Sequence, residues 1–359
     1  MRQGSAVHKT LEDQVHRSVP IEIQSKEDAW GLRIWNVIQG LKTLRETGMT
    51  RELEIWGLVD GQVVNGVIDE LSYICPDKDL EEEATARTAH GTKTASADQT
   101  TIADFCKSPK EQDGVLKTLR SMRKKTDKIY LTDVKTRGVK TVPKGASFRP
   151  TLMQLMLYHL MLSDLVTGKV DPTVLFARYE LDTAAPFSDS FIAQIAALDE
   201  EYYYDALASP SKSQPISPSD RSQTPPSGQD PLSLLLAHNS LTLLWSLLLS
   251  QLKLTFPSGA ASIGSVLKVE YRDQSSGSIT GLKTFCYDKD VISEYVDEEM
   301  RWWKGEREAR GVEVEEAYKC RSCEFAEGCG WRREKVEEAV RAVRERQGLR
   351  EEERRRSVV

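Results

Sequence analysis

The sequence is poor in cysteine, in net positive charge and in apolar residues near its start. It holds six cysteines in 359 residues, too few for a secreted domain held together by disulfides. Its 49 basic residues are outnumbered by 55 acidic ones, giving a net charge of −6, which excludes a uniformly basic coat for nucleic acid but not a local basic groove. The first twenty residues are polar and lack the apolar stretch that is typical of a secretory signal.

One long apolar run stands out against this polar background. Residues 232–252 contain eleven leucines and no charged residue, enough to span a bilayer. The run also carries four serines, a threonine, His238, Asn239 and Gln251, and each of these polar groups is costly in lipid. We therefore predict a buried leucine-rich helix and no membrane partner.

The remaining segments alternate between helix and strand patterns. Residues 25–47 repeat apolar side chains at helical spacing, and residues 53–59 and 62–74 read as two strands joined by the hairpin turn Asp60-Gly61. The later predicted elements are a strand at 128–136, a helix at 149–166, a hairpin at 264–272 and 279–287, and charged helices at 290–310 and 331–356. This order predicts an α/β fold.

Two stretches, about 76–128 and 209–231, have few large apolar residues. Neither buries enough apolar surface to offset its ordering entropy. We expect both to be disordered insertions in one core of residues 1–317, followed by a cysteine segment and a charged helix at 318–359.

The sharpest chemical signal is the stretch 131–137, Leu-Thr-Asp-Val-Lys-Thr-Arg. On a strand Asp133 and Lys135 project to the same side, and Val134 points to the other. A carboxylate can bind Mg²⁺, and a lysine beside it can orient an attacking water for phosphodiester hydrolysis. Alone, the pair is more often an ordinary surface ion pair, because Asp-x-Lys is frequent by chance.

A second carboxylate follows the pattern Gly66-Val-Ile-Asp69. Here Asp69 can share a metal with Asp133, and Gly66 allows close approach of the backbone. Near the start of the chain, His8 and Glu12 are four residues apart and share a helix face, where they can complete a metal shell.

Polar and basic side chains follow the Asp-x-Lys strand. Gln154 and Tyr158 lie four residues apart on the next helix, in reach of a substrate backbone or a metal-bound water. Residues 134–163 contain no acid. Their five bases suit a groove for DNA phosphates: Lys135, Arg137, Lys140, Lys144 and Arg149.

Three cysteines near the end form a C-x₂-C-x₅-C pattern: Cys320, Cys323 and Cys329. Three thiolates at this spacing predict a metal or cluster site. Zinc would need a fourth ligand, for which one of the scattered thiols Cys75, Cys106 and Cys286 is an open alternative. We otherwise read those three as ordinary thiols.

Taken in order, these motifs resemble the RecB-like branch of the PD-(D/E)xK nuclease superfamily, and with the cysteines they resemble the exonuclease V family. The resemblance implies a restriction-endonuclease-like α/β/α core with a mixed sheet. It also implies a Mg²⁺-dependent exonuclease that degrades single-stranded DNA from an end, mainly 5′, into short oligonucleotides in DNA repair or genome maintenance.

The resemblance assigns roles to single residues. His8, Asp69, Asp133 and the carbonyl of Val134 would bind metal. Lys135 would position the nucleophile, supported by Glu12, Gln154 and Tyr158. DNA would be bound by Arg137, Lys140, Lys144 and Arg149. Cys320, Cys323 and Cys329 would hold a 4Fe-4S cluster together with one cysteine upstream of the histidine motif.

That upstream cysteine is absent here, because the sequence begins only seven residues before His8. We therefore expect an N-terminally incomplete chain whose fourth cluster ligand is missing, or a lost cluster. The expected setting is mitochondrial or nuclear. The expected partners are single-stranded DNA and a single-strand-binding protein, and the chain is expected to be a monomer.

Two rival functions stay open. One is a structure-specific flap nuclease of the same superfamily; a fused helicase is disfavoured because the sequence has no phosphate-binding Gly-x-x-x-x-Gly-Lys-Ser/Thr loop. The other is a catalytically silent DNA-binding or zinc scaffold, which would not need to keep Asp69, Asp133 and Lys135 together.

Overall fold

The computed structural model describes residues 21–89, 128–196 and 231–356. The chain divides into two compact units. Unit 1 comprises Met1–Val142 and Thr151–Ile292, and unit 2 comprises Pro143–Pro150 and Ser293–Val359. Each unit is described by itself below, and the predicted division at residue 318 stays a prediction.

Unit 1 is built on one five-stranded sheet in the order β1-β2-β3-β4-β5. The strands are β1 (Met49–Val59), β2 (Gln62–Ser72), β3 (Tyr130–Arg137), β4 (Val266–Asp273) and β5 (Ile279–Cys286). All neighbours are antiparallel except β3 and β4, which run parallel. Parallel neighbours need a long crossover, and the helices between β3 and β4 supply it. This mixed sheet with helices confirms the predicted α/β class.

Helices α2 (Lys26–Thr47), α5 (Arg149–Val166), α6 (Pro172–Arg178) and α9 (Leu241–Thr255) accompany the sheet. The predicted boundaries of α2 are correct because local chemistry fixes them. The Ser25 hydroxyl oxygen accepts a hydrogen bond from the Asp28 N–H at 2.9 Å, and Gly48 ends the helix in the left-handed region at φ 87°.

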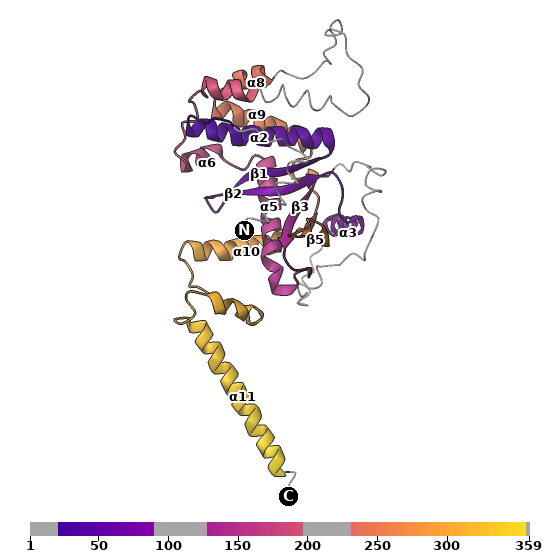
Figure 1. Cartoon of the computed structure of the whole chain (residues 1–359), viewed down its shortest axis with the longest axis vertical. Coiled ribbons are helices and arrows are strands. Elements are labelled where there is room, and N and C mark those ends of the chain that lie inside the picture. The colour runs from indigo at the N-terminus through magenta and orange to yellow at the C-terminus, as the bar shows by residue number, and fades with distance from the viewer. Residues whose placement is uncertain (1–20, 90–127, 197–230, 357–359) are drawn as a thin grey trace. The chain divides into compact units, whose positions relative to one another are not determined.

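Two neighbouring residues of β1 show how the layers form. The Trp56 ring packs among aromatic rings from α2 and α9, with centroids 5.9 Å from Trp30 and 5.8 Å from Trp245. The next residue, Gly57, lies against α5, because a Cβ there would be 2.8 Å from the Met161 side chain. This part of the sheet therefore has α2 and α9 on one face and α5 on the other (Figure 1).

The leucine-rich run is not one helix. It forms α8 (Pro231–Ala237) and α9, separated where the Ser240 hydroxyl caps α9 by accepting from the Leu243 N–H. Its buried leucines are Leu235, Leu241, Leu244, Leu247, Leu248 and Leu252. Within the described residues, every helix is too short or too polar to cross a membrane. The prediction of buried leucines is confirmed, and the prediction of a single helix is wrong.

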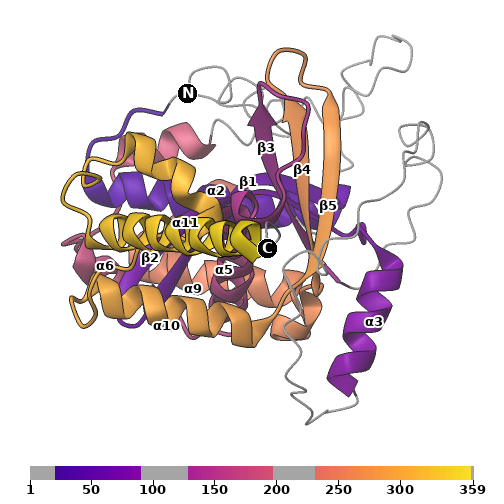
Figure 2. The same ribbon diagram turned by 90° about the horizontal axis from the view of Figure 1, so that it is seen from below.

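The prediction that 76–128 is unstructured is wrong for its first part. Helix α3 (Lys78–Ala89) lies there, beside β5 (Figure 2). The buried carboxylate of Glu81 accepts hydrogen bonds from the Val266 N–H at 2.9 Å and from the Lys128 ammonium at 2.8 Å. These partners are distant in sequence, so composition gave no sign of them. Residues 90–127 and 197–230 lie outside the described residues.

Unit 2 contains most of α10 (Lys289–Trp303), η2 (Gly145–Ser147), η4 (Val314–Ser322) and α11 (Gly330–Arg356). The predicted helix 290–310 ends seven residues early because Gly305 adopts the left-handed region at φ 75° and its N–H bonds back to the Trp302 carbonyl. Helix α11 is charged, and its described side chains are largely exposed, as predicted.

The role of the Glu81 carboxylate as a hydrogen-bond acceptor is testable. Replacing Glu81 by alanine leaves the Val266 N–H and the Lys128 ammonium without this acceptor, and we expect a loss of about 1–3 kcal/mol in the free energy of unfolding. Glu82→Ala, one residue along on the exposed side of α3, should change it by less than about 0.5 kcal/mol. Denaturant midpoints measure both, and equal midpoints would show that α3 does not stabilise the sheet.

Candidate active site

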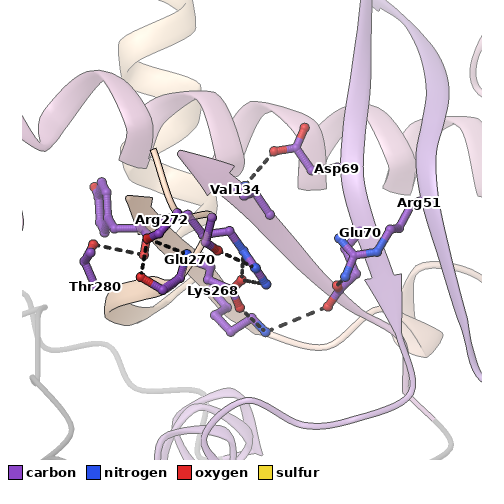
Figure 3. Close-up of polar contacts among 12 residues, drawn as sticks. Arg51, Asp69, Glu70, Val134, Lys268, Glu270, Arg272 and Thr280 are labelled. Atoms are coloured by element: carbon purple, nitrogen blue, oxygen red, sulfur yellow. Dashed lines mark hydrogen bonds and ion pairs between the residues drawn. The ribbon is translucent and has the colours of Figure 1, made fainter. Parts of the chain in front are cut away.

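The candidate site forms where β2 and β3 part. Their ladder runs through Ser72↔Tyr130 and Leu71↔Leu131 and ends at Glu70↔Thr132. One residue further along β2, a side chain replaces the backbone as the hydrogen-bond partner of β3. Asp69 Oδ2 accepts a hydrogen bond from the Val134 backbone N–H at 2.6 Å (Figure 3). A carboxylate of β2 is thereby held against the strand that carries Asp133 and Lys135.

The same geometry orients the Val134 carbonyl. In an extended strand the N–H and C=O of one residue point to the same lateral side. Since the Val134 N–H points toward β2, its carbonyl also faces β2, past the last β2–β3 partner pair of the described register. The carbonyl and the Asp69 carboxylate thus share one opening in the sheet.

A backbone irregularity lies opposite Asp69. The β1–β2 register passes from Arg51↔Glu70 to Leu53↔Ile68, with no pair at Glu52 and Asp69. Here Glu52 adopts φ 50°, the left-handed region that residues other than glycine rarely occupy. The β1–β2 ladder is thus irregular at the same residue of β2 at which the β2–β3 ladder has ended.

Asp133 and Lys135 meet as the alternation of β3 predicts. The Lys135 ammonium donates to Asp133 Oδ1 at 2.9 Å and to Gln154 Oε1 at 3.0 Å, and the Gln154 amide donates to the Tyr158 hydroxyl oxygen at 3.0 Å. Asp133 is 2% exposed, whereas the Lys135 side chain is 32% exposed. An ammonium has three N–H donors, so these two bonds leave one for a water or substrate.

The Tyr158 ring depends on a glycine of β2. A Cβ added at Gly66 would lie 2.5 Å from a ring carbon of Tyr158, closer than any normal contact. The predicted role of Gly66, close approach, is therefore explained by the α5 tyrosine at the end of the hydrogen-bond chain rather than by another backbone.

The next residue of α5 fixes the helix to the end of β5. His159 is buried and its ring stacks on Tyr287, with centroids 3.8 Å apart and an interplanar angle of 21°. Burial lowers the pKa of His159 to about 4, and burial raises the pKa of Tyr287 to about 12. Both rings are therefore neutral near pH 7, which suits an apolar contact that holds Gln154 and Tyr158 in place.

Two carboxylates and a strand carbonyl are hard oxygen donors of the kind that Mg²⁺ binds. In the part of the chain that the structure describes, no three His, Cys, Asp or Glu residues are grouped to hold a metal ion. The third predicted side-chain ligand, His8, and the supporting Glu12 lie outside the described residues. The donor set of Asp69, Asp133 and the Val134 carbonyl fits Mg²⁺ by chemistry.

Comparison with known proteins now adds the family. The chain matches the family described as "Exonuclease V - a 5' deoxyribonuclease" over residues 1–332. The chain belongs to the exonuclease V family. An exonuclease V of Danio rerio is 22% identical over 330 residues, which cover 92% of this chain and 61% of that relative. The chain thus spans less than two thirds of the length of this curated relative.

The three cysteines expected in an iron–sulfur exonuclease V lie in unit 2. Cys320 and Cys329 are partly exposed and Cys323 is exposed. Within the described residues they are not grouped as a three-ligand metal site, and the 4Fe-4S cluster stays a prediction. Of the scattered thiols, Cys75 has a pKa raised by burial, and Cys106 lies outside the described residues.

The predicted DNA-binding bases fall in both units. In unit 1, Arg137 is half-buried and donates to the Thr141 carbonyl, and Lys140 is exposed. In unit 2, Lys144 and Arg149 are exposed. Two residues of the site region had not been singled out from the sequence: the buried Glu70, beside Asp69, and its half-buried ion-pair partner Arg51.

The contact of Gly66 with Tyr158 gives a prediction. Gly66→Ala forces the ring to move, and we expect a loss of about 1–3 kcal/mol in the free energy of unfolding. In a Tyr158→Ala background the same change should cost much less, because the obstructing ring is gone. Gly348→Ala, where a Cβ meets nothing within 4 Å, is the control. Additive losses in the double variant would contradict the contact.

Proposed function

We propose that the chain is a Mg²⁺-dependent 5′ deoxyribonuclease that acts on single-stranded DNA from an end, in DNA repair or genome maintenance. The observation that carries the proposal is the Lys135 ammonium, which is hydrogen-bonded to Asp133 and Gln154 beside the Asp69–Val134 contact. Membership of the exonuclease V family supports the reaction class.

In this proposal Asp69, Asp133, His8 and the Val134 carbonyl would hold Mg²⁺, which when bound supplies a Lewis acid and favours ionisation of a water. Two N–H groups of the Lys135 ammonium bond to Asp133 and Gln154, and the third orients the attacking water. The bond from Gln154 to Tyr158 fixes the amide so that its oxygen faces Lys135. Glu12 would support the metal shell.

The exposed bases would contact the DNA backbone. Phosphate neutralisation makes binding depend on salt, and Lys140, Lys144 and Arg149 are exposed for it. Arg137 would act closer to the scissile phosphate, because it ends the strand that carries Lys135. A single-strand-binding protein is the proposed protein partner.

Removing the lysine tests the chemistry. Lys135→Ala should lower the turnover of single-stranded DNA in Mg²⁺ at least about 10²–10³-fold, because a positioned charged donor is lost from the transition state. DNA binding measured without metal should stay nearly intact. Lys169→Ala removes another lysine–carboxylate pair, at 69% exposure, and should leave turnover unchanged. Near-normal turnover of the Lys135 variant would refute the assignment.

End-blocked substrates test the polarity. A block on the 5′ end should protect a labelled strand, and a block on the 3′ end should not, if products leave from the 5′ end. Cleavage of circular single strands, or of flaps alone, would favour the structure-specific nuclease instead. Absence of cleavage on all substrates with Mg²⁺ would favour the silent scaffold.

The cysteines give a separate prediction. Because Cys320, Cys323 and Cys329 supply three thiolates and a 4Fe-4S cluster takes four, we expect the chain purified without oxygen to carry far less than one cluster per chain. Iron and sulfide assays and the absorbance near ~400 nm measure this. Stoichiometric iron and sulfide would contradict it, and stoichiometric zinc would favour a zinc site completed by another cysteine.

A further inference from the structure

A second group of charged side chains lies on the face of β3 and β4 opposite Asp133 and Lys135. We call it the reverse-face cluster, and it consists of Arg51, Glu70, Lys268, Glu270 and Arg272. Its side chains are only 10–22% exposed, and they come from β1, β2 and β4. Figure 3 shows them apart from the Asp69–Val134 contact.

Two arginines close the ends of the cluster. The Arg51 guanidinium lies 2.6 Å from Glu70 Oε2, and the Arg272 Nε donates to Glu270 Oε1 at 2.6 Å. Arg272 also donates to the Gly277 carbonyl at 2.9 Å in the β4–β5 turn. Glu70 thus has an arginine on the side away from β3, and Glu270 has one two residues along β4.

Lys268 joins the two halves across β3. Its ammonium lies 3.8 Å from Glu70 Oε1 and 3.8 Å from Glu270 Oε2. In the register, Thr132 pairs with Glu70 on one side and with Lys268 on the other. The ion pair from β2 to β4 therefore passes over β3 at the last row where β2 and β3 are paired.

The position of this bridge matters because β2 and β3 part directly after it. On β2 the next residue is Asp69, and on β3 the next residues are Asp133 and Val134. Buried carboxylates are costly unless they are paired. Without the lysine, Glu70 and Glu270 would keep Arg51 and Arg272 but lose the cation that links β2 to β4 across β3. Loss of this link would leave β2 and β4 less firmly held together, and the opening in which the Asp69 carboxylate meets the Val134 N–H would widen more easily.

We propose that Lys268 is a positioning residue: its bridge from Glu70 to Glu270 fixes how far β2 and β3 part, and so fixes the spacing of the Asp69 and Asp133 carboxylates. This inference rests on the proposed function only where it refers to Mg²⁺. The geometric part concerns the hydrogen bond from Val134 to Asp69, which can be measured without DNA or metal.

The test compares Lys268→Met, Lys268→Arg and the control Lys169→Met in the full chain. Hydrogen exchange of the Val134 amide, resolved by NMR or by peptides of residues 130–137, should be about tenfold faster in Lys268→Met, because the bond to Asp69 opens more often. Amides of the β4–β5 ladder should exchange as in the wild type. Lys268→Arg should restore protection, and Lys169→Met should change nothing.

Metal binding provides the second readout. Titration with Mg²⁺ or Mn²⁺ in the absence of DNA should show an affinity about tenfold weaker in Lys268→Met, within the range that outer partners of metal ligands contribute. The Kd for single-stranded DNA measured without metal should be unchanged. If Lys268→Met fails to fold, Glu70→Gln removes the other end of the bridge and should give the same local loss of protection at Val134.

The outcomes separate the two proposals. Wild-type Val134 exchange in Lys268→Met, or an acceleration spread evenly over the whole sheet, would overturn the positioning role. Failure of Lys268→Arg to restore protection would overturn it as well. A wild-type chain that cleaves no DNA would overturn the proposed function, while the exchange result would still decide whether Lys268 positions Asp69.

Discussion

The site depends on the point where β3 loses its antiparallel neighbour. Up to Thr132 the strand is hydrogen-bonded on both sides, and beyond it only β4 continues the ladder. A buried strand edge inside a sheet leaves backbone groups to be satisfied, and the Asp69 side chain satisfies the Val134 N–H. The requirement to satisfy one backbone donor thus brings a carboxylate of β2 beside the Asp-x-Lys strand.

Helix α5 completes the arrangement from one side of the sheet. It can approach β1 and β2 closely because Gly57 and Gly66 carry no side chain toward it. The approach lets Gln154 reach Lys135 and lets Tyr158 hold Gln154. The stacking of His159 on Tyr287 fixes the same helix near the end of β5. These hydrogen bonds and ring contacts together hold Gln154 where its oxygen accepts from the Lys135 ammonium.

Features set by neighbouring residues were predictable from the sequence. The Ser25 and Gly48 ends of α2, the Asp60-Gly61 turn and the pairing of Asp133 with Lys135 all follow from the chemistry of a few adjacent positions. Features set by strand order were not predictable. The acceptor role of Glu81 toward Val266 depends on which strand edge lies beside α3, and no local pattern encodes that.

The reverse-face cluster is another feature set by strand order, and it was not predictable from the sequence. Glu70 and Lys268 meet only because β4 lies parallel to β3 in one register, and a shift of one residue would turn Lys268 to the other face. The role of Asp69 was foreseen in part: the carboxylate was expected near Asp133, but its bond to the Val134 N–H requires the ladder to end at Glu70, which the residue pattern does not reveal.

The chain order of the sheet has a consequence for biosynthesis. Strand β3 is complete at Arg137, yet its parallel partner β4 begins only at Val266. Contacts between such distant segments form late, because a long loop must close first. While the chain emerges from the ribosome, Asp133 and Lys135 are therefore on a strand with an unsupported edge, and the parallel register that aligns Lys268 with Thr132 is absent. The nascent chain would therefore lack an assembled site until β4 has been synthesised and has paired with β3.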